Sequence, residues 1–69
     1  MIEIFKTNVE NTIQAETLLA LLYHHFSCTE ISFDLDDCDR ILRVKGGEFC
    51  SFKIIQLLAN NGFECQVLV

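Results

Sequence analysis

The sequence predicts a single α+β domain in which four short strands and two helices alternate. Three observations support this fold class. The chain has 69 residues, enough for one hydrophobic core but not for two. Hydrophobic residues make up 51% of the chain and proline is absent, which is typical of a compact globular protein rather than a disordered one. The spacing of apolar residues also switches along the chain between a period of about 2 and a period of about 3.6.

The first half of the chain is expected to form a strand, a helix and a second strand. Residues 2–6 alternate apolar and polar side chains, which predicts a strand. Apolar residues recur at helical spacing between 13 and 26, and Asn11 or Thr12 is expected to cap this helix because either side chain can accept a first-turn amide. Residues 31–35 alternate again and predict a half-buried strand.

A hairpin is expected next. Residues 36–39 read as an acidic turn, because aspartate bonds its own backbone and tolerates turn geometry. Their spacing lacks the glycine and glutamate of an EF-hand loop, so a turn is favoured over a calcium site. Residues 41–44 form the returning strand, and the Gly46-Gly47 pair ends it.

The last third of the chain predicts a helix followed by a strand. Ser51 is the expected cap of this helix, and Asn60-Asn61-Gly62 is its expected end. Residues 63–69 alternate and form the final strand. The resulting βαββαβ order predicts a ferredoxin-like sandwich, with a four-stranded antiparallel sheet in the order 4-1-3-2 and both helices on one face.

The pattern of residues resembles a known family over nearly the whole chain. The first helix has Leu18, Leu21, Leu22 and Phe26 where heavy-metal-associated domains have their first-helix core. The strand at 31–35 and the ending at 61–68 are similar to the corresponding segments of that family. The family includes copper chaperones and domains of metal-pumping ATPases, so the resemblance implies their ferredoxin-like fold.

The chain departs from the family at the metal-binding loop. In the family a Met-x-Cys-x-x-Cys loop precedes the first helix, and its two thiolates hold a soft metal ion. The matching loop here covers residues 9–14, with Asn11 and Gln14 at the two cysteine positions. Amides are poor ligands for soft metals, so we expect that the usual metal binding is lost.

Four cysteines lie elsewhere, and none forms a Cys-x-x-Cys pair. Cys28 follows the first helix and Cys50 precedes the second, so both are expected at the end of the sheet opposite the loop at 9–14. They are either a pair that shares a metal ion or oxidises together, or small apolar side chains buried in the core. Cys65 shares strand parity with Phe63 and Val67 and is expected to face the core.

Composition argues against several functional classes. The formal net charge of −5 weighs against nucleic acid and anionic membranes as partners. The sequence nominates no catalytic set, glycine-rich phosphate loop or cofactor motif, so we expect a non-enzymatic protein without a cofactor. The first residues lack the basic and long apolar regions of a signal peptide, which leads us to expect a cytoplasmic location.

An apolar sheet face is the remaining candidate site. If Ile2 faces the helices, parity places Phe5 on the open face, together with Ile41 and Leu68 and near Arg43. Such a patch marks a protein partner or a homodimer contact, although scattered surface hydrophobics are also ordinary. On this hypothesis Phe5→Glu is expected to disrupt association without unfolding the domain.

The sequence therefore favours a small non-catalytic binding domain of heavy-metal-associated type that has lost soft-metal binding. The alternative is a metal-binding or metal-trafficking protein that uses Cys28 and Cys50 as ligands.

Overall fold

A computed structural model describes residues 1–68 and contains the predicted sequence of six elements. The four strands are β1 (Ile2–Thr7), β2 (Thr29–Asp34), β3 (Ile41–Gly46) and β4 (Cys65–Val67). The two helices are α1 (Thr12–His25) and α2 (Ser51–Asn60). The predicted last strand extended to Val69, which lies outside the described residues. Within residues 1–68, neither helix is long and apolar enough to cross a bilayer.

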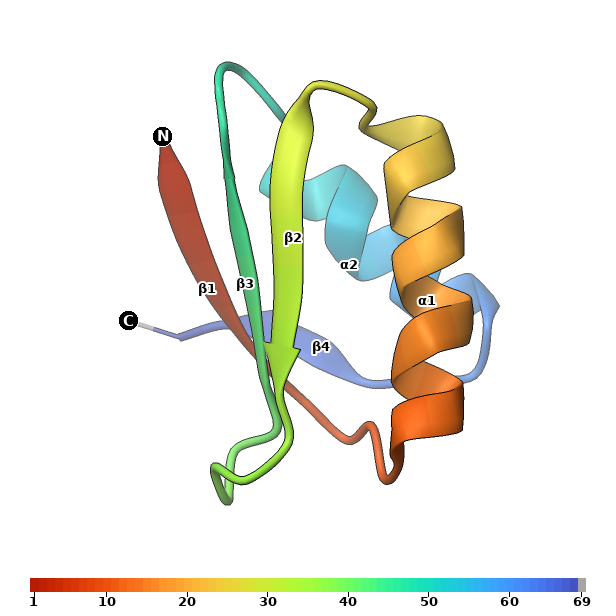
Figure 1. The fold of residues 1–69 in the computed structure, drawn as a ribbon. Coiled ribbons are helices and arrows are strands. Elements are labelled where there is room, and N and C mark those ends of the chain that lie inside the picture. Colours follow the sequence, from red (N-terminus) through yellow and green to blue (C-terminus); the bar gives the residue numbers. More distant parts are fainter. Residues whose placement is uncertain (69) are drawn as a thin grey trace.

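The strands form one antiparallel sheet in the order β2-β3-β1-β4, which is 4-1-3-2 when read from the other edge. Both helices lie on the same side of this sheet (Figure 1). The predicted α+β class is therefore confirmed. In the ladders Phe5 lies opposite Leu42 of β3 and Val67 of β4, so these three side chains share a face.

The hydrophobic core fills the space between the two helices and one face of the sheet. Its largest fully buried side chains come from β1, the β1–α1 connection, both helices and β3: Phe5, Val9, Leu18, Leu22, Leu42, Val44, Ile54 and Leu58. Ile31 of β2 is also buried, and Phe33 packs against this cluster. The half-buried strand that the alternation at residues 31–35 predicts is therefore confirmed.

The predicted parity of β1 was wrong by one residue. Phe5 is 0% exposed and lies in the core, whereas Ile2 is 57% exposed on the opposite side of the strand. Thr7 shares the inward face with Phe5 and is also buried. The sheet therefore presents Ile2 and Ile4, and not Phe5, on the face that the helices leave open.

The helix ends follow the predictions in part. Asn11 is the N-cap of α1, as one of the two alternatives required. The prediction that Ser51 caps α2 was wrong, because Cys50 holds the N-cap position and no side chain bonds the first turn. The Ser51 hydroxyl instead donates to the carboxylate of Glu3, at 3.1 Å. Gly62 follows α2 with a φ of +86°, the left-handed conformation that glycine adopts without strain.

A tyrosine connects α1 to the edge strand β2. The Tyr23 hydroxyl accepts a hydrogen bond from the Ile31 amide at 2.9 Å and donates to the Ile31 carbonyl at 3.0 Å. The N–H and C=O of one strand residue point to the same side, so both groups of Ile31 point away from β3. One side chain therefore satisfies two backbone groups at the outer edge of the sheet.

Candidate functional site

The predicted site residues fall in three separate places. The connection between β1 and α1, which ends at Asn11, lies beside the turn between β2 and β3 at one end of the molecule (Figure 1). Gln14 lies in the first turn of α1, directly after this connection. Cys28 and Cys50 lie in the two connections at the other end. Ile41, Arg43 and Leu68 belong to the open side of the sheet.

Asn11 and Gln14 bond to the first turn of α1 and to the residue before it. The side-chain oxygen of Asn11 accepts a hydrogen bond from the Gln14 amide at 2.9 Å. The side-chain oxygen of Gln14 in turn accepts one from the Glu10 amide at 2.8 Å. This reciprocal arrangement is a variant of the capping box, and it satisfies two amides that the helix itself leaves unpaired. The side chains of Asn11 and Gln14 therefore fix the start of α1 and the residue before its N-cap by hydrogen bonds to the backbone.

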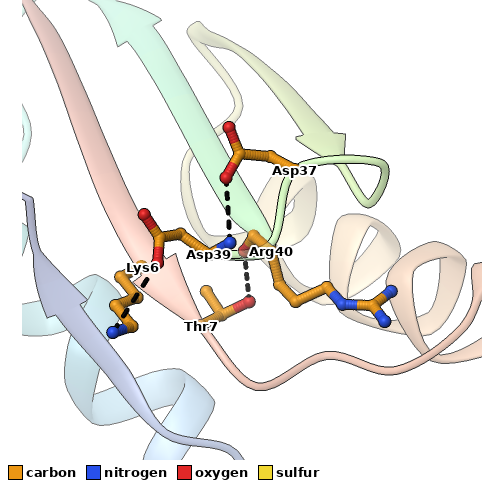
Figure 2. Close-up of polar contacts among 5 residues, drawn as sticks. All are labelled: Lys6, Thr7, Asp37, Asp39 and Arg40. Atoms are coloured by element: carbon orange, nitrogen blue, oxygen red, sulfur yellow. Dashed lines mark hydrogen bonds and ion pairs between the residues drawn. The ribbon is translucent and has the colours of Figure 1, made fainter.

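Thr7, at the end of β1, forms hydrogen bonds to the turn between β2 and β3. Its hydroxyl donates to the Arg40 carbonyl at 2.6 Å and accepts a hydrogen bond from the buried Val9 amide at 3.3 Å. The Thr7 amide donates to the Asp39 carbonyl at 3.1 Å. Figure 2 shows the Thr7 hydroxyl directed at the Arg40 carbonyl. Thr7 therefore joins two loops that are more than 30 residues apart in the sequence.

Arg40 stabilises the same junction from the other side. Its φ of +47° places it in the left-handed region, which costs a non-glycine residue about 1 kcal/mol or more. Its guanidinium donates to the Leu35 carbonyl at 3.1 Å and to the Glu10 carbonyl at 3.3 Å. The side chain thus bonds both the turn and the β1–α1 connection, which holds this backbone conformation in place.

The acidic turn contains the one cluster of three potential metal-ligating side chains in the described residues, namely Asp37, Cys38 and Asp39. Both carboxylates already have partners. Asp37 accepts a hydrogen bond from the Asp39 amide at 2.8 Å, and Asp39 lies 3.6 Å from the ammonium of Lys6 (Figure 2). These contacts are those of an acidic hairpin turn, as predicted.

Cys28 and Cys50 are both exposed, so the prediction that they are buried apolar side chains was wrong. The two connections that carry them lie close together. A Cβ added to Gly46 would lie 3.2 Å from the Cys28 carbonyl oxygen, and a pocket of about 210 Å³ is lined by Cys28 and by Gly47, Glu48 and Phe49. Cys28 is therefore open to solvent beside the connection that leads to Cys50.

Cys65 faces the core side of the sheet, as predicted, and packs against the core cluster. It is half-buried and lines a groove of about 540 Å³ between β4 and α2. Burial disfavours the charged thiolate and raises the pKa of Cys65 to about 12. Cys65 is therefore a poor nucleophile and a poor metal ligand at neutral pH.

These exposures predict how the native thiols react with Ellman's reagent. We expect three thiols, those of Cys28, Cys38 and Cys50, to react rapidly in the reduced folded protein. Cys65 should react at least about 10 times more slowly, because its thiolate is disfavoured. Cys65→Ala should remove only the slow phase, and four equally fast thiols in the native protein would contradict this placement.

The open face of the sheet is defined by the residues that alternate with the core positions. They are Ile2, Ile4 and Lys6 of β1, Glu30, Ser32 and Asp34 of β2, Ile41, Arg43 and Lys45 of β3, Gln66 of β4, and Leu68. The Leu68 amide donates to the Ile4 carbonyl at 2.8 Å, which continues the β4 ladder beyond its last residue. We refer to this set as the open face.

The structure places three of the four residues predicted for an interaction surface on this side of the sheet, and their contact with a partner stays a prediction. Arg43 and Leu68 lie on it and are exposed, and Ile41 points to the same side but is only 6% exposed. Phe5 does not belong to it. Ile2, Ile4, Lys6 and Lys45 were missed, and the alternation of Ile2, Ile4 and Lys6 is the signal from which a correct parity would have found them.

Fold and geometry together define a small α+β domain. Hydrogen bonds join its β1–α1 connection to its β2–β3 turn, and no helix covers one face of its sheet. In the comparisons with known proteins no family model, no curated protein and no solved structure matches the chain.

Proposed function

We propose that the chain is a non-catalytic binding domain with a ferredoxin-like fold, related to heavy-metal-associated domains but without their soft-metal site. The observation that supports this most is the pair of hydrogen bonds made by Asn11 and Gln14. These residues stand at the positions where the family has its two metal-binding cysteines. Here the same two positions hold the helix start through hydrogen bonds between protein groups.

The chemistry of this loop opposes metal capture in two ways. Amide oxygens are hard donors, whereas Cu(I) prefers thiolates and thioethers. Each amide oxygen also already accepts a backbone hydrogen bond, so a metal ion would have to displace it and leave a backbone amide unpaired. In this proposal the loop serves to cap the helix and does not hold a metal ion.

The proposal predicts that thiols at these two positions restore metal binding. We expect the double variant Asn11→Cys/Gln14→Cys to retain one Cu(I) per chain against a competing small thiol, as measured by native mass spectrometry. The wild-type protein should remain metal-free under the same conditions. The expected gain in affinity is at least about 100-fold, because two soft anionic ligands replace two neutral amides.

Asn11→Ser/Gln14→Ser is the matched control, because serine has nearly the shape of cysteine but lacks the thiol. It should bind no metal, and a serine hydroxyl in place of the Asn11 amide would still cap the helix. Equal metal binding by the control and the cysteine variant would contradict the alignment of this loop with the family's metal loop. A wild-type chain that retains one metal ion would contradict the loss of metal binding.

A second candidate function is metal binding by Cys28 and Cys50. The observation in its favour is that both thiols are exposed and lie in neighbouring connections at one end of the sheet. Should the wild-type chain retain one metal ion, Cys28→Ser or Cys50→Ser is expected to abolish it. Retention of the metal by both variants would exclude these ligands.

A further inference from the structure

We infer that the open face docks a partner protein through an acidic segment that also carries apolar side chains. This inference rests on the proposed function as a binding domain and adds the surface and the chemistry of the partner. It is carried by the exposed apolar side chains of the open face and by the charge that surrounds them.

The exposed apolar part of the open face is formed by Ile2 and Ile4 of β1 and by Leu68, which follows β4. Ile4 lies between Arg43 of β3 and Leu68 beyond β4, and Ile2 lies opposite Lys45. Ile2 is 57% exposed and Leu68 is 41% exposed. Burying such side chains against a partner stabilises a complex by about 25 cal/mol for each Å² of apolar surface removed from water. A sheet face without covering helices normally remains polar, so this strip is unusual.

Charge distinguishes this face from the rest of the molecule. It holds Lys6, Arg43 and Lys45, which are three of the five basic residues of the chain, but only two of its ten acidic residues, Glu30 and Asp34. Its formal side-chain charge is therefore +1, whereas the remaining two basic and eight acidic residues give −6. Asp39, which lies 3.6 Å from Lys6, offsets this excess, so the face is close to neutral on an otherwise acidic protein. Arg43 and Lys45 are the cations on it that the carboxylates of an acidic partner can reach.

Two of the three basic side chains on the open face are available for pairing with a partner. Lys6 has an ion-pair partner, Asp39, at 3.6 Å. Arg43 and Lys45 are exposed and have no ion pair among residues 1–68. Arg43 flanks Ile4 and Lys45 flanks Ile2 in the ladder of β1 and β3. Carboxylates beside apolar side chains of a partner would meet both cations as the apolar surfaces come together.

This combination favours an acidic protein segment over two other occupants. A second copy placed face to face would set three cations and two carboxylates against the same set, which attracts less than the carboxylates of an acidic segment do. Single-stranded nucleic acid binds open sheets of this kind by stacking bases on aromatic side chains, and no open-face residue is aromatic.

Selection from a random 16-residue peptide-display library tests the inference directly. We expect enriched peptides to combine apolar residues with adjacent aspartates or glutamates. The best peptide, made synthetically and titrated into isotope-labelled protein, should shift the amide resonances of Ile4, Arg43 and Leu68. Its affinity should fall as the salt concentration rises, because exposed ion pairs are screened.

Matched variants then separate the open face from the rest of the surface. Arg43→Glu/Lys45→Glu should weaken peptide binding by at least about tenfold, whereas Lys53→Glu on α2 should change it less than about twofold. Ile2→Ser should weaken binding, and Ile13→Ser, which removes the same side chain from a site on α1 that is 77% exposed, should not.

Three results would overturn the inference. The first is enrichment of peptides without acidic residues, or of none at all. The second is a peptide whose resonance shifts map to the helices, which leaves the proposed binding function standing. The third is a homodimer in solution that Arg43→Glu/Lys45→Glu dissociates, which would make a second copy the occupant. Retention of a metal ion by the wild-type chain contradicts the proposed function alone and is measured separately.

Discussion

Phe5→Glu unfolds the domain. Phe5 is 0% exposed at the centre of the core, opposite Leu42 and Val67 in the middle of the sheet. A carboxylate at this position would be desolvated without a partner, which costs several kcal/mol in addition to the lost packing of the ring. A domain of this length has a total stability of about 4–10 kcal/mol. We therefore expect the circular dichroism of an unfolded chain at 25 °C, and not a folded domain with altered association.

A milder substitution makes this prediction quantitative. Phe5→Ala should lower the free energy of unfolding by about 3–5 kcal/mol, measured by urea denaturation. Phe52→Ala is the matched control, because Phe52 is 70% exposed on α2. It should change the stability by less than about 0.5 kcal/mol. A folded Phe5→Glu variant with wild-type stability would contradict the placement of Phe5 in the core.

Thr7→Val is expected to have the next largest effect. The substitution preserves the shape of the side chain but removes the hydroxyl that donates to the Arg40 carbonyl and accepts from the buried Val9 amide. Both backbone groups then lose a partner in a partly buried place. We expect the free energy of unfolding to fall by about 1–3 kcal/mol. Urea denaturation measures the loss.

Thr17→Val provides the comparison for this loss. Thr17 is exposed on α1, and its hydroxyl donates only to the Ile13 carbonyl one turn earlier. That carbonyl is solvated when the hydroxyl is removed, so the stability should change by less than about 0.5 kcal/mol. Equal losses from both variants would indicate that Thr7 contributes through its β-branched shape rather than through its hydroxyl.

The order of the elements was predictable from the sequence because periodicity reports directly on helices and strands. The parity of β1 was not. Its apolar residues occur at 2, 4 and 5, so both faces of the strand carry apolar side chains. The inward face also holds Thr7, a polar residue that is buried only because its hydroxyl bonds Arg40, 33 positions away. Local alternation contains no information about such a partner.

The candidate sites show the same division between local and distant information. The capping role of Asn11 was predictable, because an N-cap bonds a residue three positions on. That Ser51 does not cap α2 was not predictable, since its hydroxyl bonds Glu3 of β1, which is 48 positions away in the sequence. The basic border of the open face also depends on which strands become neighbours. Lys6 is distant in the sequence from Arg43 and Lys45, and it shares a face with them only because β1 pairs with β3.

The Tyr23 hydroxyl also affects how the chain behaves at high concentration. An edge strand with free N–H and C=O groups is a template on which another chain can add a strand, and this is a common start of aggregation. Tyr23 bonds both outward groups at the middle of β2, so an incoming strand would have to displace it at that point. The phenol therefore hinders strand addition at the middle of the longer edge, whereas no side chain among residues 1–68 bonds the backbone of β4, the other edge strand.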